Sequence, residues 1–159
     1  MSRPSMSLCM IVKNEADCIE RCLQSVTDLV DEIIVVDTGS TDETVAICER
    51  YNAIVMQHEW EDDFSKARNI GIQKAKGDWI LWLDADEEWY GDATYMKDLL
   101  QATTASVLSV SVVNFHGESE PVDDDQAFLL YQYRLFRNKE DILFTNNIHE
   151  RIVLQEDQK

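Results

Sequence analysis

The stretch WILWLDADEEW, residues 79–89, joins an apolar run to a cluster of carboxylates. Residues 79–83 are all apolar, a pattern typical of a strand that is buried on both faces. Four of the next five residues are acidic. Carboxylates packed this closely repel each other and favour water or a cation. The sequence therefore predicts a buried strand over residues 78–83 that ends at a site of concentrated negative charge.

Apolar strands alternate with amphipathic helices along the first half of the chain. Further buried strands are predicted over residues 7–13, 32–37 and 53–57. Continuous apolar strands that alternate with helices indicate a parallel sheet covered on both faces. We therefore expect an α/β fold with a Rossmann-like, mostly parallel sheet that is flanked by helices.

Polar residues mark the start of each helix between these strands. Asn14 is placed to cap the first helix, since asparagine is a favoured N-cap residue. Residues 40–43, STDE, have the spacing of a capping box and open the second helix. The third helix is predicted to begin at Asp63, to place Phe64, Ala67 and Ile70 on its inward face and to be stopped by Gly77.

The second half of the chain is rich in predicted strands. A helix is expected over residues 93–102, followed by a strand over residues 106–115. An acidic loop, residues 116–126, leads to a long strand over residues 128–138 that pairs antiparallel with the previous one. A last strand is expected around residues 148–154. The sequence thus predicts a β-rich C-terminal part beside the α/β part.

Charge and cysteine content narrow the class of protein. The 159 residues include 31 acids and 14 bases, a formal net charge of −17, which disfavours binding to nucleic acid and to anionic membranes. No apolar run approaches the roughly 18 residues that a membrane span needs, and residues 1–7 lack the apolar segment of a signal peptide. The four cysteines lack C-x-x-C spacing and are expected to be buried free thiols. These features favour a cytoplasmic protein.

Carboxylates follow three of the four predicted strands of the first half. Glu15 follows the first strand, Asp37 ends the second, and Asp84 with Asp86 ends the fourth. In open α/β sheets the ligand crevice lies beyond the carboxyl ends of the strands. If strand geometry continues past residue 83, Asp84 and Asp86 point to the same side. A divalent cation, Mg²⁺ or Mn²⁺, bound by one or two carboxylates and by phosphate oxygens, would suit this crevice; the alternative is a solvated strand end.

Four motifs follow one another in order along the first half. They are CMIVKNEADCIERCLQSV (residues 9–26), EIIVVDTGSTDET (32–44), DFSKARNIG (63–71) and DWILWLDADE (78–87). Together they resemble the nucleotide-sugar half of family 2 glycosyltransferases with the GT-A fold, and the resemblance covers about residues 6–88. It implies one GT-A domain over residues 1–159. Within it, residues 1–88 would bind the nucleotide-sugar and residues 89–159 would form part of an acceptor half that many relatives extend.

The resemblance implies roles for residues around the acidic cluster. Asp84-Ala85-Asp86 is similar to the D-x-D motif of the family. By this likeness Asp86 would ligate the metal, while Asp84 would contact the ribose or the water shell of the metal. Arg68 would add positive charge near the nucleotide, with Asn69 assisting. The alternative for Arg68 is an ion pair with a surface acid.

The resemblance also places the nucleoside near the first two strands. Val12 to Glu15, a segment that includes Asn14, would line the uridine pocket, with Glu15 near the ribose. Asp37 would accept a hydrogen bond from the uracil ring. The alternative for Asp37 is a helix-capping or turn residue.

Membership of family 2 would imply inverting transfer from a UDP-sugar, with Mn²⁺ or Mg²⁺ stabilising the departing diphosphate. Inversion requires a general base that deprotonates the acceptor hydroxyl. The segment NNIHERI, residues 146–152, resembles an Ile-His-Glu segment of a soluble branch of the family. By this likeness His149 would be a further metal ligand or a contact of the diphosphate. Glu150 would act as the base, so that Glu150 and the metal ligand Asp86 would be the catalytic residues. Residues 123–125, all aspartates, compete for the role of base.

The acceptor and the assembly are left open by the sequence. The acceptor would be a saccharide, a peptide or a lipid-linked molecule, and exposed strands of the second half would allow a homodimer. QYRLF, residues 132–136, lacks the Gln-x-x-Arg-Trp motif of processive polysaccharide synthases. The alternatives to a glycosyltransferase are a non-catalytic nucleotide-sugar-binding module and a nucleotidyltransferase. The latter would be expected to carry a glycine-rich loop where residues 13–18 read KNEADC.

Overall fold

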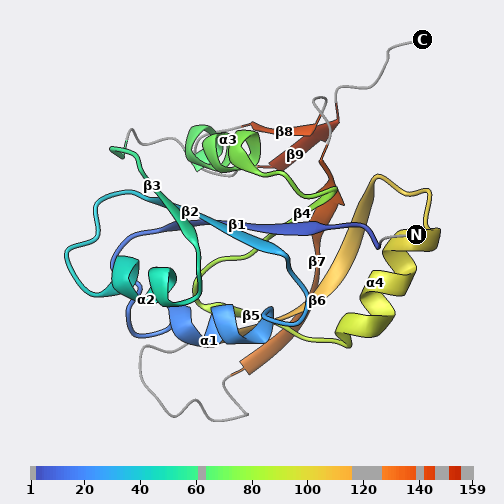
Figure 1. Ribbon diagram of the computed structural model, residues 1–159, viewed down its shortest axis with the longest axis horizontal. Helices are drawn as coiled ribbons and strands as arrows, with labels where there is room; N and C mark the ends of the chain where they lie inside the picture. The colour runs from blue at the N-terminus through green and yellow to red at the C-terminus, as the bar shows by residue number, and fades with distance from the viewer. Residues whose placement is uncertain (1–2, 61–63, 116–126, 139–141, 146–150, 155–159) are drawn as a thin grey trace.

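The computed structural model describes residues 3–60, 64–115, 127–138, 142–145 and 151–154, and Figure 1 shows how their elements are arranged. In chain order the elements are β1 (Met6–Val12), α1 (Ile19–Ser25), β2 (Glu32–Asp37), α2 (Thr44–Arg50), β3 (Ile54–Gln57), α3 (Phe64–Lys74), β4 (Trp79–Trp82), β5 (Glu87–Trp89), α4 (Ala93–Ala102), β6 (Val107–Phe115), β7 (Ala127–Arg137), β8 (Ile142–Thr145) and β9 (Arg151–Leu154).

The described strands form a mixed sheet in the order β3-β2-β1-β4-β7-β6-β5. Strands β3, β2, β1 and β4 run parallel to one another, whereas β7 is antiparallel to β4 and β6. The hairpin β8–β9 forms a separate two-stranded sheet. The predicted α/β fold with a β-rich C-terminal part is confirmed, as is the antiparallel pairing of the two long strands.

Helices cover both faces of the sheet, with α1, α2 and α4 on one side and α3 with the β8–β9 hairpin on the other (Figure 1). Alternate residues of β4 pack into the two hydrophobic cores, one on each face of the sheet. Trp79 and Leu81 belong to the larger core cluster with α1, and Ile80 packs with Ile72 of α3 in the smaller cluster. This two-sided burial explains why the strands of the first half are apolar at nearly every position.

Helix α3 presents a different face from the one predicted. Ala67 is buried as the apolar spacing requires, but Arg68 and Ile72 are buried as well, while Ile70 is only half-buried. The helix ends at Lys74, before Gly77, and the predicted start at residue 63 lies outside the described residues. Arg68 lies on the inward face of the helix, where it lines the cleft described below.

The two predicted helix caps are wrong. Helix α1 has no side-chain cap, and Asn14 instead adopts a left-handed φ of 53° and accepts hydrogen bonds from the N–H groups of Thr41 (2.8 Å) and Asp42 (3.3 Å). Helix α2 also lacks a side-chain N-cap. Since β1 and β2 are adjacent and parallel, the loops that follow them meet at the carboxyl end of these strands. The Ser40 hydroxyl accordingly serves the neighbouring loop, where it accepts the N–H of Asn14 (2.8 Å).

Two short strands were not predicted. β5 and β8 have three and four residues, and β5 begins immediately after the turn that carries Asp84 and Asp86. All four cysteines are free thiols, three of them buried and Cys18 half-buried. Within the described ranges, no helix has the length and apolar character needed to cross a membrane.

Candidate functional site

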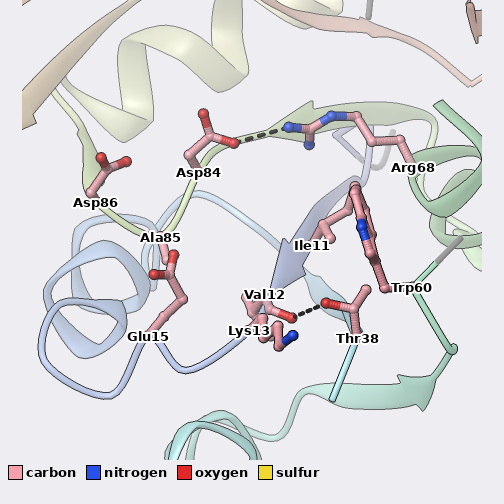
Figure 2. Close-up of a pocket in the computed structure, with 10 residues that line it drawn as sticks. All are labelled: Ile11, Val12, Lys13, Glu15, Thr38, Trp60, Arg68, Asp84, Ala85 and Asp86. Carbon is pink, nitrogen blue, oxygen red and sulfur yellow. Dashed lines mark hydrogen bonds and ion pairs between the residues drawn. The ribbon is translucent and has the colours of Figure 1, made fainter. Parts of the chain in front are cut away.

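The carboxyl ends of β1 and β4 open onto a cleft of about 510 Å³ (Figure 2). This is the place where an open α/β sheet generally binds its ligand. Its lining residues come from the β1 end, the β2 end, the loop after β3, helix α3 and the turn after β4: Ile11, Val12, Lys13, Glu15, Thr38, Trp60, Arg68, Asp84, Ala85 and Asp86.

The β1 side of the cleft is fixed by backbone contacts with the second strand and helix. The carbonyl of Val12 accepts hydrogen bonds from the N–H (3.0 Å) and the hydroxyl (3.1 Å) of Thr38. The N–H of Glu15 donates to the hydroxyl of Thr44 at 2.8 Å. With its backbone held in this way, Glu15 directs its carboxylate into the cleft (Figure 2).

Asp84 and Asp86 lie on a turn rather than on a continued strand. β4 ends at Trp82, and the N–H of Glu87 donates to the carbonyl of Asp84 at 3.0 Å, which closes the turn. Strand geometry therefore does not continue past residue 83, because β5 begins only at Glu87. Both aspartates nevertheless line the same cleft.

The carboxylates of the cleft repel one another. Burial, followed by the charges of Asp86, Asp84 and Asp42, raises the pKa of Glu15 above its usual range. Partial desolvation raises the pKa of Asp86, and the charges of Asp84 and Glu87 add to that rise. A cation placed among these groups would relieve the repulsion.

Arg68 brings positive charge to this acidic cleft. Only 6% of its side chain is exposed, and its Nη2 lies 2.9 Å from Oδ1 of Asp84 (Figure 2). The guanidinium also lies over the ring of Trp82, 4.0 Å from the ring centroid. Its partner Asp84 lines the cleft with a side chain that is 47% exposed, so the ion pair of the alternative interpretation is present at the cleft itself. Asn69, the next residue of α3, is half-buried and does not line the cleft.

Two predicted nucleotide-binding residues lie beside the cleft without lining it. Asp37 is 1% exposed, and its carboxylate accepts hydrogen bonds from the N–H groups of Gly39 (3.3 Å) and Ser40 (3.1 Å) and from the Ser40 hydroxyl. Asn14 holds the same loop through the bonds described above. In this structure both residues shape the loop after β2.

Sequence reasoning missed Trp60 and Thr38. Trp60 reaches the cleft from the loop after β3 and lies beside Ile11 of β1 (Figure 2). A single tryptophan within the charged stretch HEWED, residues 58–62, was the available signal. The predicted residues His149 and Glu150, and the competing aspartates at 123–125, lie outside the described residues.

The described side chains suit a cation that is bound together with a ligand. No group of three or more His, Cys, Asp and Glu residues among them is arranged to hold a metal by itself. Asp86 is exposed at the rim of the cleft, and Asp84 engages Arg68 through one oxygen. Mg²⁺ and Mn²⁺ are commonly held by one or two carboxylates, with phosphate oxygens and water completing the shell. The donor set therefore fits a hard divalent cation that arrives with a phosphate group.

Comparison with known proteins gives one consistent family. The family model described as Glycosyl transferase family 2 matches residues 7–155. The chain is 45% identical over 146 residues to a TPR repeat-containing protein of Synechococcus elongatus, and 34% identical over 151 residues to the SPbeta prophage-derived glycosyltransferase SunS of Bacillus subtilis. These matches cover 91% and 92% of this chain but 34% of each relative, so the chain spans about a third of their length.

Solved structures share the fold. S. aureus TarS 1-349 superposes with a TM-score of 0.65 at 23% identity, covering 89% of this chain and 50% of that chain. The same TarS fragment in complex with UDP-GlcNAc superposes with a TM-score of 0.54 at 25% identity, covering 65% of this chain and 33% of that chain. The likeness places the sheet and its flanking helices among GT-A glycosyltransferases.

Proposed function

Because the chain belongs to glycosyltransferase family 2, we propose that it forms the donor-binding domain of a metal-dependent glycosyltransferase. The enzyme would move a sugar from a UDP-sugar to an acceptor hydroxyl, with inversion at the anomeric carbon. One observation carries the proposal: the ends of β1 and β4 and helix α3 bring Glu15, Asp84, Asp86 and Arg68 to one cleft of about 510 Å³.

The choice of a uridine nucleotide is supported by the residues that line the cleft and by one solved structure of the same fold. Val12 and Glu15 at the β1 end would face the nucleoside, and Trp60 offers an aromatic surface on the same cleft. TarS, which was crystallised with UDP-GlcNAc, shares this fold at 25% identity. Asp37 would contribute by holding the loop that borders this end, or by accepting a hydrogen bond from the uracil ring.

The diphosphate would lie near the turn after β4. Asp86 would hold the divalent cation, Mn²⁺ or Mg²⁺, and Asp84 would contact the ribose or the water around the metal. Arg68 would hold Asp84 in place and add positive charge near the phosphates. When bound, the cation would supply charge stabilisation to the departing diphosphate.

The acceptor side of the reaction rests on the family resemblance. Glu150 would act as the general base that takes the proton of the acceptor hydroxyl, with the aspartates at 123–125 as competing candidates. His149 would be a further ligand of the metal. The acceptor would be a saccharide, a peptide or a lipid-linked molecule.

Calorimetric titration with UDP, and with GDP for comparison, tests the donor site in the presence of Mn²⁺ and of a chelator. We expect UDP to bind only with Mn²⁺, and Asp86→Ala to weaken that binding at least about tenfold, which corresponds to about 1.4 kcal/mol. Asp98→Ala is the matched control, because Asp98 is an exposed acid of α4 that pairs with Arg3 at 3.3 Å. It should bind UDP like the unmodified protein.

Two outcomes would count against the proposal. Equal binding of UDP with Mn²⁺ and with chelator would show that the donor site does not need the metal. Absence of binding to either nucleotide would show that the cleft is not a donor site. Release of UDP from a UDP-sugar by the protein would then separate an enzyme from a non-catalytic binding module.

A further inference from the structure

Strand β7 carries one extra residue where it passes β6. Leu108 pairs with Leu135, but the next residue of β6, Ser109, pairs with Tyr133. Arg134 is therefore the unpaired residue of a β-bulge. Bulges re-aim a side chain and are frequent beside active sites. Here the bulge accompanies an arginine that is 8% exposed.

Arg134 forms a buried, two-pronged ion pair with Glu87 of β5. Its Nη1 and Nη2 lie 2.6 Å and 3.0 Å from the two carboxylate oxygens of Glu87, and the two side chains are 9% and 3% exposed. Parallel N–H···O bonds of this kind fix orientation as well as distance. The pair joins residues that are 47 positions apart in the sequence.

Glu87 in turn holds the turn that carries Asp84 and Asp86. Its Oε1 accepts the N–H of Asp84 at 2.8 Å, and its own N–H donates to the carbonyl of Asp84 at 3.0 Å. The carboxylate that receives Arg134 is thus the same carboxylate that fixes the first residue of the turn.

A second route connects Arg134 with the turn. Its guanidinium lies 3.9 Å from the centroid of the Trp82 ring, and that of Arg68 lies 4.0 Å from the same centroid. Arg68 then binds Oδ1 of Asp84.

We propose that Arg134 and Glu87 are positioning residues, which hold the Asp84–Asp86 turn in the geometry that receives the cation and the diphosphate. This inference rests on the proposed donor site. It also means that β7, from the second half of the chain, supports a cleft whose lining residues all come from the first half. Neither residue lines the cleft, so their influence acts through Asp84 and Asp86.

The test replaces both charges at once, Glu87→Met with Arg134→Met. Removing one partner would leave an uncompensated buried charge, whereas replacing a buried pair by apolar residues of similar volume is often tolerated. The readout is the Mn²⁺ concentration that gives half-maximal UDP binding. We expect the double variant to melt cooperatively and to need at least about tenfold more Mn²⁺, a change that a purely structural role would not produce.

Arg137→Met is the matched control on the same strand. Arg137 also lies over a tryptophan, 4.5 Å from the Trp79 centroid, and it donates to the carbonyls of Thr103 (2.7 Å) and Ala105 (2.8 Å). It makes no contact with the turn through these groups. Its loss should lower the melting temperature without changing the Mn²⁺ requirement.

The outcomes separate this inference from the proposed function. If the unmodified protein fails to bind UDP with Mn²⁺, the donor site and the inference fall together. If unmodified protein binds and the double variant shows the same Mn²⁺ requirement, the positioning role alone is wrong. Should the double variant unfold, Arg134→Lys decides, because lysine keeps the charge but loses the planar fork. A folded lysine variant with an unchanged Mn²⁺ requirement would overturn the inference, and a raised requirement would support it.

Discussion

At the scale of single residues, Gly77 is needed because two backbone segments approach each other closely. A Cβ at this position would lie 2.6 Å from Oγ and 2.7 Å from N of Ser7, and 2.9 Å from the carbonyl carbon of Met6. Backbone atoms within a central strand move aside only at a cost. We expect Gly77→Ala to lower the free energy of unfolding by about 1–3 kcal/mol, measured by urea denaturation.

Gly71 provides the control for this prediction. A Cβ there would make ordinary contacts, the nearest at 3.5 Å to Cγ2 of Val36. Alanine favours a helix interior over glycine by about 0.5–1 kcal/mol, so Gly71→Ala should leave α3 as stable or more stable. Equal unfolding free energies for the two alanine variants would show that the approach at Gly77 relaxes without cost. The sequence indicated a helix stop at Gly77, but the contact with Ser7 depends on a strand 70 residues away.

At the scale of elements, the three-residue strand β5 depends on a side chain of α1. The hydroxyl of Ser25 donates to the carbonyl of Cys22 (2.6 Å) and accepts the N–H of Trp89 (3.0 Å). Ser25→Ala removes that acceptor from Trp89. We expect the Trp89 amide to exchange its hydrogen about fivefold faster, since a lost hydrogen bond of this kind is worth about 1 kcal/mol.

Thr27→Ala is the control for the tether between α1 and β5. Thr27 donates to the carbonyl of Gln24 at 3.2 Å, the same local bond that Ser25 makes, and no bond to β5 accompanies it. Hydrogen exchange at Trp89 should be unchanged in this variant. Identical exchange in the serine and threonine variants would mean that pairing with β6 alone secures β5.

The parallel strands whose bounds were predicted most closely share one physical property. β1, β2 and β4 lie within one or two residues of the predicted bounds, because burial on both faces requires a continuous apolar run. β5 reads as acidic, EEW; in the structure Arg134 pairs with Glu87, and β6 is the neighbouring strand of β5. Such long-range pairs leave no periodic signal in the sequence.

The residues of the candidate site divide in the same way, into those predicted from the ends of strands and those placed by long-range packing. Val12, Glu15 and Arg68 line the cleft together with Asp84, Ala85 and Asp86, as expected from the rule that ligands bind beyond the ends of parallel strands. Their roles with a ligand stay predictions. Trp60 lies on a loop whose path depends on the packing around it, so its place in the cleft could not be read from local sequence.

At the scale of the whole molecule, negative charge exceeds positive charge by 17. The described residues include two well-buried ion-pair cations, Arg68 and Arg134, and both serve the acidic turn. Other described pairs, such as Arg3–Asp98 and Arg50–Glu20, are largely exposed and contribute little to stability. The folded state therefore concentrates like charges that the unfolded chain would spread apart.

Screening by salt should consequently stabilise the fold. At about 0.01 M ionic strength the Debye length is about 30 Å, against about 8 Å at 0.15 M, so repulsion across the whole domain acts only in the dilute buffer. We expect the melting temperature to rise when NaCl increases over this range. A fall would mean that screening weakens attractive pairs more than it relieves repulsion.

Mn²⁺ with UDP, added at constant ionic strength, should raise the melting temperature further, because a ligand that binds only the folded state stabilises it. Since this second increment requires a specific site, it should disappear in Asp86→Ala and persist in Asp98→Ala.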